Sequence, residues 1–258
     1  MTAPSELVPD ALACQGVSKQ FGGLRALRDV TLTFSGERVY GLIGPNGAGK
    51  TTLVNVLSGR LRPTAGSITL GGQDITSLGP AARTHAGIAR SFQITQIFAG
   101  FTVRENVEIA LQPFTFRLQP FWRPSTRYRQ LREKADEVLE RFALADKAGV
   151  LADRLSHGDQ RGLDLALATV SNPRVLLLDE PLAGVGQHEI ARAVERIRSV
   201  VRGRTVVLID HNMGAVMEVS DHVVVMTDGS VLMAGSPAEV QRDARVRAAY
   251  LGDEVALA

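Results

Sequence analysis

The chain has 258 residues, a formal net charge of +2 and a hydrophobic content of 45%. This length and composition suit one α/β domain, or one domain with a sizeable insertion, and exclude a disordered chain. The single cysteine excludes an internal disulfide, and no stretch approaches the roughly 18 uncharged apolar residues of a membrane span. Because the first twenty residues also lack the apolar core of a signal peptide, a role at a membrane would need another chain to span it.

Residues 44–51 read Gly-Pro-Asn-Gly-Ala-Gly-Lys-Thr, the pattern of a phosphate-binding loop. A short apolar strand is expected before the loop, over residues 38–43, and a helix after it, over residues 52–59. The glycines let successive backbone N–H groups face a phosphate at the positive end of that helix. The alternative is a flexible glycine turn, but the bare pattern arises by chance in only about one chain of this length in a hundred. The sequence therefore predicts a nucleotide site.

Nine residues of this loop and the helix start are expected to contact the nucleotide: Gly44, Pro45, Asn46, Gly47, Ala48, Gly49, Lys50, Thr51 and Thr52. Lys50 would place a positive charge on the β- and γ-phosphates of ATP, and the Thr51 hydroxyl would bind Mg²⁺.

The remaining elements are expected in three groups along the chain. Residues 28–34, 39–43 and 67–72 read as strands, so the N-terminal third is rich in β structure. Residues 104–111 and 131–142 read as helices of a helical insertion. The apolar runs at 175–178, 205–209 and 222–226 are typical of buried parallel strands, with a helix through Ile190, Val194, Ile197 and Val201 between the first two. This order predicts an α/β fold with a parallel sheet covered on both faces.

Two carboxylates, Asp179 and Glu180, end the apolar run at 175–178. The carboxyl edge of a parallel sheet is where α/β proteins place ligands. Asp179 is expected to hold Mg²⁺ through its hydration shell, and Glu180 to polarise the water that attacks the γ-phosphate. A solvated turn is the alternative, and the phosphate loop makes it the less favoured one.

Because it has the phosphate loop followed by the carboxylates Asp179 and Glu180, the chain resembles the nucleotide-binding subunit of an ATP-binding cassette (ABC) transporter from Leu12 to Gly252. The resemblance implies that Phe21 stacks on adenine, that Gln93 touches Mg²⁺ and senses the membrane partner, and that His211 is the switch histidine of catalysis. Each of the three also has a plain structural alternative: a core aromatic, a surface amide and a capping histidine. Their joint order along the chain favours the functional interpretation.

Residues 155–159, Leu-Ser-His-Gly-Asp, occupy the place of the family signature segment. Ser156 is also a good N-cap, with Asp159 three residues later as a capping acid. The resemblance implies head-to-tail pairing of two subunits, in which Ser156, His157, Gly158 and Asp159 cover the γ-phosphate held by the other subunit. An acid stands here in place of the usual glutamine, so Asp159 is expected to stabilise its own helix but repel that phosphate if it comes close.

The resemblance implies a P-loop ATPase core with an antiparallel β subdomain over residues 1–92 and 162–258, and a helical subdomain over 93–161. The expected partners are a second nucleotide-binding subunit, identical or a paralogue, and transmembrane permease subunits with or without a solute-binding protein, at the cytoplasmic face of the cell membrane. No nucleic-acid partner is expected. The segments Phe21-Gly22-Gly23-Leu24, Pro181-Leu182-Ala183-Gly184 and Ala249-Tyr250-Leu251-Gly252 are similar to the branched-chain amino acid and urea importer branch.

Two other function classes stay open. A soluble ABC ATPase acting on nucleic acid or ribosomes is the main alternative, although such proteins commonly carry two cassettes or a long coiled-coil insertion. A small kinase or GTPase would lack the signature segment and the adenine platform.

One segment interleaves arginines with five aromatic residues, Phe114, Phe116, Phe121, Trp122 and Tyr128. It is interpreted as part of a subdomain core, as a face toward the permease or lipid headgroups, or as a single-strand nucleic-acid site. Prolines at 113, 120 and 124 argue against one continuous helix there.

Overall fold

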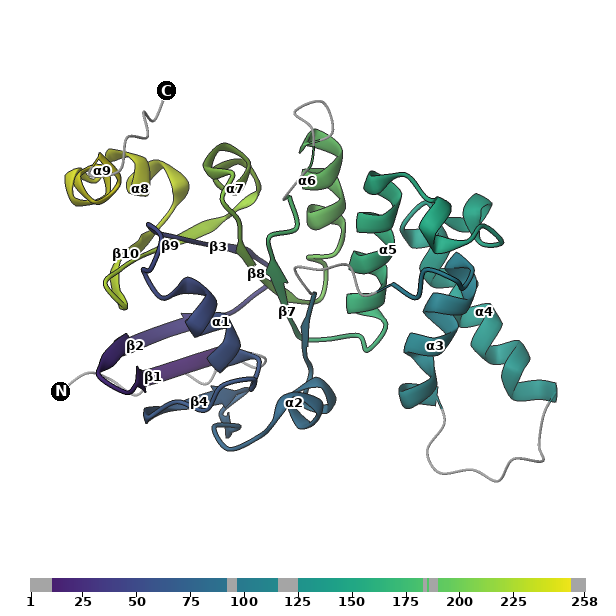
Figure 1. Ribbon diagram of the computed structural model, residues 1–258, viewed down its shortest axis with the longest axis horizontal. Coiled ribbons are helices and arrows are strands. Elements are labelled where there is room, and N and C mark those ends of the chain that lie inside the picture. The colour runs from purple at the N-terminus through teal and green to yellow at the C-terminus, as the bar shows by residue number, and fades with distance from the viewer. Residues whose placement is uncertain (1–10, 92–96, 116–124, 183–184, 186–189, 252–258) are drawn as a thin grey trace.

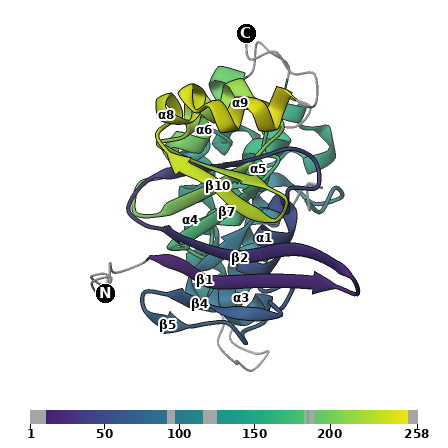
Figure 2. The same cartoon turned by 90° about the vertical axis from the view of Figure 1, so that its left-hand side faces the viewer.

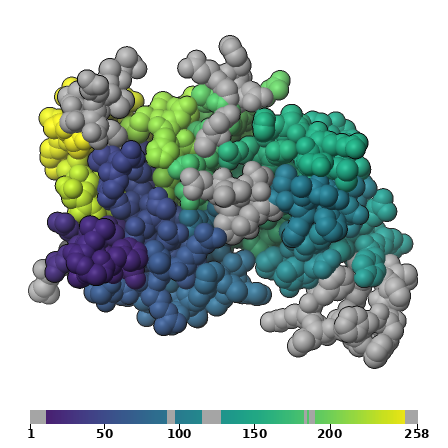
Figure 3. Space-filling view, in the orientation of Figure 1, coloured from purple at the N-terminus to yellow at the C-terminus, as the bar shows by residue number. Residues whose placement is uncertain are grey.

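The computed structural model describes residues 11–91, 97–115, 125–182, 185 and 190–251. Within these residues, two β-sheets and their helices form layers, and the helices α3 and α4 lie at the end of the molecule away from the antiparallel strands (Figures 1 and 3). None of the helices in the described part of the chain combines the length and apolar character that crossing a bilayer requires.

A six-stranded sheet lies at the centre of the described fold. Its strands, in spatial order, are β10 (Ser230–Gly235), β9 (His222–Thr227), β3 (Val39–Ile43), β8 (Thr205–Ile209), β7 (Val175–Asp179) and β6 (Ile88–Arg90). All neighbours pair in parallel except β9 and β10, which are antiparallel. The parallel strands predicted from the apolar runs are thus confirmed, whereas β6 and the edge strand β10 were not predicted.

The continuous apolar runs arise because both faces of the sheet are covered. Along β8, Val206 and Leu208 pack into one hydrophobic cluster while Val207 and Ile209 pack into the other, since successive side chains of a strand point to opposite faces. One cluster includes residues of α6 (Ile190–Ser199) and α7 (Met213–Val219), and the other includes Leu53 of α1 (Lys50–Leu57). Because both faces are buried, polar chemistry is expected at the strand ends, and α/β proteins place their ligands at the carboxyl ends.

A four-stranded antiparallel sheet lies beside α1 (Figure 2). Its order is β2 (Leu24–Phe34), β1 (Leu12–Phe21), β4 (Ala65–Leu70) and β5 (Gln73–Asp74). The predicted strands at 28–34 and 67–72 fall in β2 and β4, which confirms a β-rich N-terminal third. The strand β1 was not predicted.

The helices α3 (Val103–Thr115), α4 (Ser125–Arg141) and α5 (His157–Thr169) follow, with two short 3₁₀ turns, η1 (Ala145–Lys147) and η2 (Ala152–Arg154), between α4 and α5. Their buried hydrophobic residues belong to the same cluster as those of α6 and α7. The boundaries predicted for a separate helical subdomain, 93 and 161, therefore stay a prediction. Pro113 lies inside α3, which ends at Thr115, and α4 begins at Ser125, so the described residues of this segment belong to two helices.

The remaining helices are α2 (Pro80–Ala86), α8 (Pro237–Arg242) and α9 (Ala244–Leu251). The helix α2 carries Arg83, whose side chain is fully buried beside the end of α1. Its Nη1 donates to the carbonyls of Val56 and Leu57, both at 2.7 Å, and the other guanidinium nitrogens donate to Leu78 and Thr76. This arginine thus satisfies the Leu57 carbonyl at the C-terminus of α1 and adds a second donor to the Val56 carbonyl, which also accepts from Gly59 N at 3.2 Å. It fixes the helix that begins in the phosphate loop.

We expect Arg83→Met to lower the free energy of unfolding by about 2 to 4 kcal/mol, because several buried carbonyls lose their donor at once. Urea titration of the purified chain measures this. Arg25→Met, at an exposed position of β2, is the matched control and should change stability by less than about 0.5 kcal/mol. Equal stabilities of the two variants would show that Arg83 is dispensable for α1.

Candidate ATP-binding and catalytic site

The phosphate loop joins β3 to α1, as the sequence predicts. Gly44 and Gly49 have φ angles of +152° and +95°, and Gly49 is the N-cap of α1. A Cβ on Gly49 would lie 2.6 Å from the carbonyl oxygen of Ala26, and one on Gly44 would clash with the carbonyl of Met226. Both glycines are therefore required by close backbone approach as well as by conformation. The first N–H groups of α1 are left to face an anion at this end of the helix.

Lys50 is buried, and its Nζ donates to the carbonyls of Gly44 at 2.6 Å and Pro45 at 2.9 Å. Burial lowers the pKa of the Lys50 ammonium, and the Glu180 carboxylate works in the opposite direction. The loop carbonyls thus hold the Lys50 ammonium against the start of the phosphate loop. Replacing a carbonyl by a phosphate oxygen would give this ammonium a stronger, charge-assisted bond.

Asp179 lies at the carboxyl end of β7 and is almost fully buried. Its Oδ2 accepts a hydrogen bond from Arg90 Nη2 at 2.5 Å, and Arg90 Nη1 also donates to Asn55 Oδ1 and Ser58 Oγ near the end of α1. Among the described residues the other carboxylate oxygen of Asp179 has no hydrogen-bond partner, so it is available to a water or a metal ion. Arg90 was not predicted as a site residue.

The oxygen donors at this edge suit Mg²⁺. Thr51 is exposed at the start of α1, and Asp179 supplies a carboxylate. Within the described ranges no three His, Cys, Asp or Glu side chains cluster as a metal cage. A few hard oxygen ligands without a cage fit an ion that keeps its waters and binds the phosphates of its nucleotide. Gln93, the third predicted ligand, lies outside the described residues.

Glu180 and His211, the two predicted catalytic residues, meet across adjacent strand ends. His211 Nε2 lies 2.9 Å from Glu180 Oε1, with the Glu180 side chain mostly buried and the His211 side chain mostly exposed. Glu180 has a φ of +52°, and its N–H donates to the Ile209 carbonyl at 2.7 Å. A left-handed glutamate costs about 1 kcal/mol or more, and this kind of strain is concentrated at functional sites.

Asp210 fixes the loops that carry this pair. The buried Asp210 carboxylate accepts from the N–H of Leu182 at 2.8 Å and from the N–H of Asn212 at 3.0 Å. These bonds join the segment after Glu180 to the segment after His211. This role of Asp210 was not predicted from the sequence.

Phe21 ends β1 and is 44% exposed, so it is not a core residue. Lys19 Nζ lies 5.0 Å from the centre of its ring and donates to the Arg62 carbonyl. An exposed ring with a cation over it leaves the other face for a flat ligand. This position is compatible with the predicted adenine platform.

The signature segment forms the start of α5, with Ser156 as N-cap. Ser156 Oγ accepts from Asp159 N and donates to Asp159 Oδ2 at 2.6 Å. In the described part of the chain, no hydrogen bond or ion pair joins residues 156–159 to the phosphate loop.

Comparison with known proteins bears on this site directly. A family model described as ABC transporter matches residues 27–183, and one described as Branched-chain amino acid ATP-binding cassette transporter matches residues 230–256. The chain is 37% identical to the high-affinity branched-chain amino acid transport ATP-binding protein BraF of Pseudomonas aeruginosa, over 94% of this chain and 98% of that one.

Two other similarities help to define the chain. It is 33% identical to the lipopolysaccharide export system ATP-binding protein LptB of Haemophilus influenzae, over 95% of this chain and 99% of that one. A crystal structure of an ATP-binding cassette of an ABC transporter in its ADP conformation superposes with a TM-score of 0.83 at 29% identity, covering 95% of this chain and 99% of that chain.

The chain belongs to the ABC transporter family. It is an ATP-binding and ATP-hydrolysing subunit of that family, so the predictions of family, fold and ATPase activity are confirmed. The similarity to the branched-chain amino acid branch is confirmed as well, because the second family model covers the predicted ending at 249–252. The roles of individual residues in this ABC ATPase stay predictions that its geometry supports.

We expect Lys50→Ala and His211→Ala to separate binding from turnover in this ABC ATPase. Lys50→Ala should abolish tight ATP binding, because it removes a charged phosphate contact, whereas His211→Ala should bind ATP within about threefold of the parent and lose turnover. Fluorescent-nucleotide titration and phosphate release measure the two properties. Equal losses of affinity would make His211 a structural residue.

Proposed function

We propose that this chain energises the import of branched-chain amino acids, or of a related small polar solute such as urea, by ATP-driven closure of a cassette dimer. The ATPase part of this proposal is supported mainly by the Glu180–His211 pair at the strand ends. Lys50 lies near enough to Glu180 for the carboxylate to work toward raising the pKa of Lys50. The cargo rests on the names of the relatives and on the branch-specific ending.

Each site residue has a defined task in this proposal. The loop N–H groups and Lys50 bind the β- and γ-phosphates, and Phe21 stacks on adenine. Glu180 accepts a proton from the attacking water, and His211 orients Glu180 and the γ-phosphate. Thr51, Asp179 and Gln93 would hold Mg²⁺, which when bound neutralises charge on the phosphates.

An exposed aromatic pair supports a permease partner. Phe98 and Phe101 are 52% and 46% exposed, with ring centres 5.8 Å apart. The fully buried Asn106 holds their backbone, since its Oδ1 accepts from Phe98 N at 2.7 Å and its Nδ2 donates to the carbonyls of Phe98, Phe101 and Thr102. A rigidly presented apolar pair on a surface is typical of a binding site for another protein.

The aromatic and basic segment is described only in part. Phe114 and Tyr128 are exposed, which disfavours the subdomain-core interpretation for these two residues. Phe116, Phe121 and Trp122 lie outside the described residues. A face toward permease subunits or lipid headgroups at the cytoplasmic side of the membrane is the interpretation that fits the proposed transport role.

We expect Glu180→Gln to bind ATP but to hydrolyse it at least tenfold more slowly, because positioning and electrostatics carry phosphoryl transfer. The variant should accumulate as an ATP-bound dimer, which sedimentation of the purified chain with excess ATP detects. Hydrolysis within about threefold of the parent, only about 0.65 kcal/mol in barrier, would exclude Glu180 as the base.

The transport role predicts co-purification with permease subunits from solubilised membranes. Deletion of the gene should then reduce uptake of radiolabelled leucine or urea, and the wild-type chain but not Glu180→Gln should restore it. Restoration by Lys134→Met, at an exposed position of α4, serves as the control. Normal uptake with a defect in lipopolysaccharide export would instead assign the chain to the function named for its LptB relative.

A further inference from the structure

An acid at the signature segment conflicts with its proposed task. Asp159 sits in the first turn of α5, which would cover the γ-phosphate of a second copy. Two negative groups brought together in a closing, drying interface repel strongly. Either Asp159 weakens the dimer or something in the chain compensates for it.

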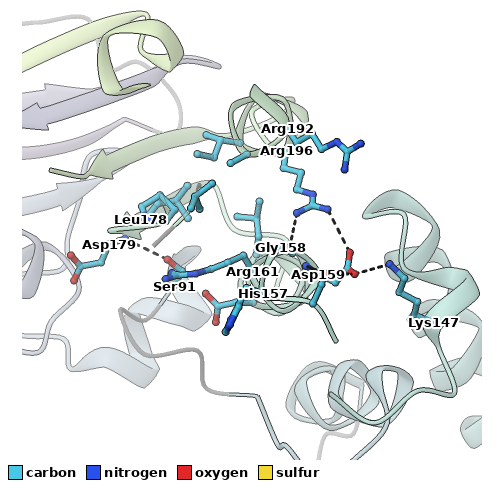
Figure 4. A pocket seen from close by; sticks show the side chains of 17 residues that line it. Ser91, Lys147, His157, Gly158, Asp159, Arg161, Leu178, Asp179, Arg192 and Arg196 are labelled. Carbon is cyan, nitrogen blue, oxygen red and sulfur yellow. Dashed lines mark hydrogen bonds and ion pairs between the residues drawn. The ribbon is translucent and has the colours of Figure 1, made fainter. Parts of the chain in front are cut away.

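The structure supplies the compensation. Lys147, at the end of η1, donates from Nζ to Asp159 Oδ2 at 2.7 Å, and Ser156 Oγ donates to the same oxygen. Arg196 Nη2 on α6 lies 3.8 Å from Asp159 Oδ1. Figure 4 shows Arg196 and Lys147 reaching the carboxylate from opposite sides. The Asp159 side chain is only 16% exposed, so the carboxylate faces these cations rather than bulk solvent.

Arg196 also holds the backbone of the segment. Its Nη1 donates to the Gly158 carbonyl at 2.5 Å, and its guanidinium lies over Gly162, where a Cβ would come 3.7 Å from Cζ. A helix on the central sheet thereby fixes the turn that starts α5. Burial works to raise the pKa of Asp159, but the bonds from Lys147 and Ser156 outweigh it and hold that pKa below its ordinary value.

The balance of charge around the segment is positive. A cavity of about 390 Å³ between the start of α5, α6 and the end of β7 is lined by four cations and three acids. They are Lys147, Arg161, Arg192 and Arg196, and Asp159, Asp164 and Asp179. Asp179 is neutralised by Arg90 outside this set. The acidic signature therefore stands in a cationic surrounding that favours an anion.

We propose that Lys147 and Arg196 are positioning residues that neutralise Asp159 and so make an acidic signature compatible with the γ-phosphate of the paired copy. The inference rests on the proposed ATP-driven pairing. Lys147 carries most of the effect, since its bond to Asp159 is about 1 Å shorter than that of Arg196 (2.7 against 3.8 Å).

The test uses the full chain carrying Glu180→Gln, with the ATP concentration for half-maximal dimerisation measured by sedimentation. Adding Lys147→Met should raise this concentration at least about fivefold, because the Asp159 carboxylate then keeps only Ser156 and the more distant Arg196 while it faces the partner's phosphate. Adding Asp159→Asn to Lys147→Met should restore the parent value within about twofold. Lys147→Arg should keep it, and Lys134→Met, an exposed lysine of α4, is the matched control.

Rescue of Lys147→Met by Asp159→Asn distinguishes an electrostatic role of Lys147 from a purely structural one. If Lys147→Met merely loosened η1, removing the negative charge of Asp159 would not restore pairing, and that result would overturn the proposal. An unchanged ATP dependence in Lys147→Met would overturn it too. Failure of the Glu180→Gln parent itself to dimerise with ATP would refute the pairing on which the proposed function depends, and the positioning role with it.

Discussion

Three segments far apart in the chain meet through their backbones at the phosphate loop, and the site depends on this junction. Gly229 N donates to the Ala48 carbonyl, and Arg28 N donates to the Gly229 carbonyl. A Cβ on Gly49 or on Gly229 would come within 2.8 Å of the Ala26 carbonyl oxygen. Only glycine permits such approach, so the loop is held between β2 and the turn from β9 to β10. The antiparallel sheet and the central sheet thereby meet at the phosphate loop.

The sequence predicts well what is local. The phosphate loop is a contiguous sequence motif, so it can be recognised directly. The buried strands β3, β7, β8 and β9 are predicted by their uninterrupted apolar residues. The strand β1 escapes prediction because its alternation breaks: the register shifts between Cys14 and Val17, around Gly16 with a φ of +61°. The three-residue β6 exists only through its pairing with β7, so no periodicity of its own could reveal it.

The residues that hydrogen-bond to the site acids could not be predicted from the sequence. Asp179 is paired with Arg90, which is 89 residues earlier, and Asp210 accepts from Leu182, which is 28 residues earlier. No spacing rule connects these positions, since the parallel sheet brings the ends of distant strands to one edge. The sequence therefore predicts which acids take part in the chemistry, while only the fold shows which groups hold them in place. Asp159 is the clearest example. From its neighbours in sequence it is a helix cap whose negative charge would repel a phosphate, and only the fold shows that Lys147 and Arg196 face this charge.

Charge pairing across elements also explains how the two regions of the molecule can act together. Arg196 belongs to α6 on the central sheet, yet it bonds the backbone at the start of α5, and Arg161 of α5 donates back to the Glu180 carbonyl at 3.4 Å. A shift of α5 would therefore move the strand end that carries Glu180, the proposed base, and a shift of that strand end would move α5. A neutral glutamine in place of Asp159 would offer Arg196 and Lys147 no ion pair. The Asp159 carboxylate thus links α5 to α6 by an ion pair, and the cations that line the nearby cavity favour an anion there.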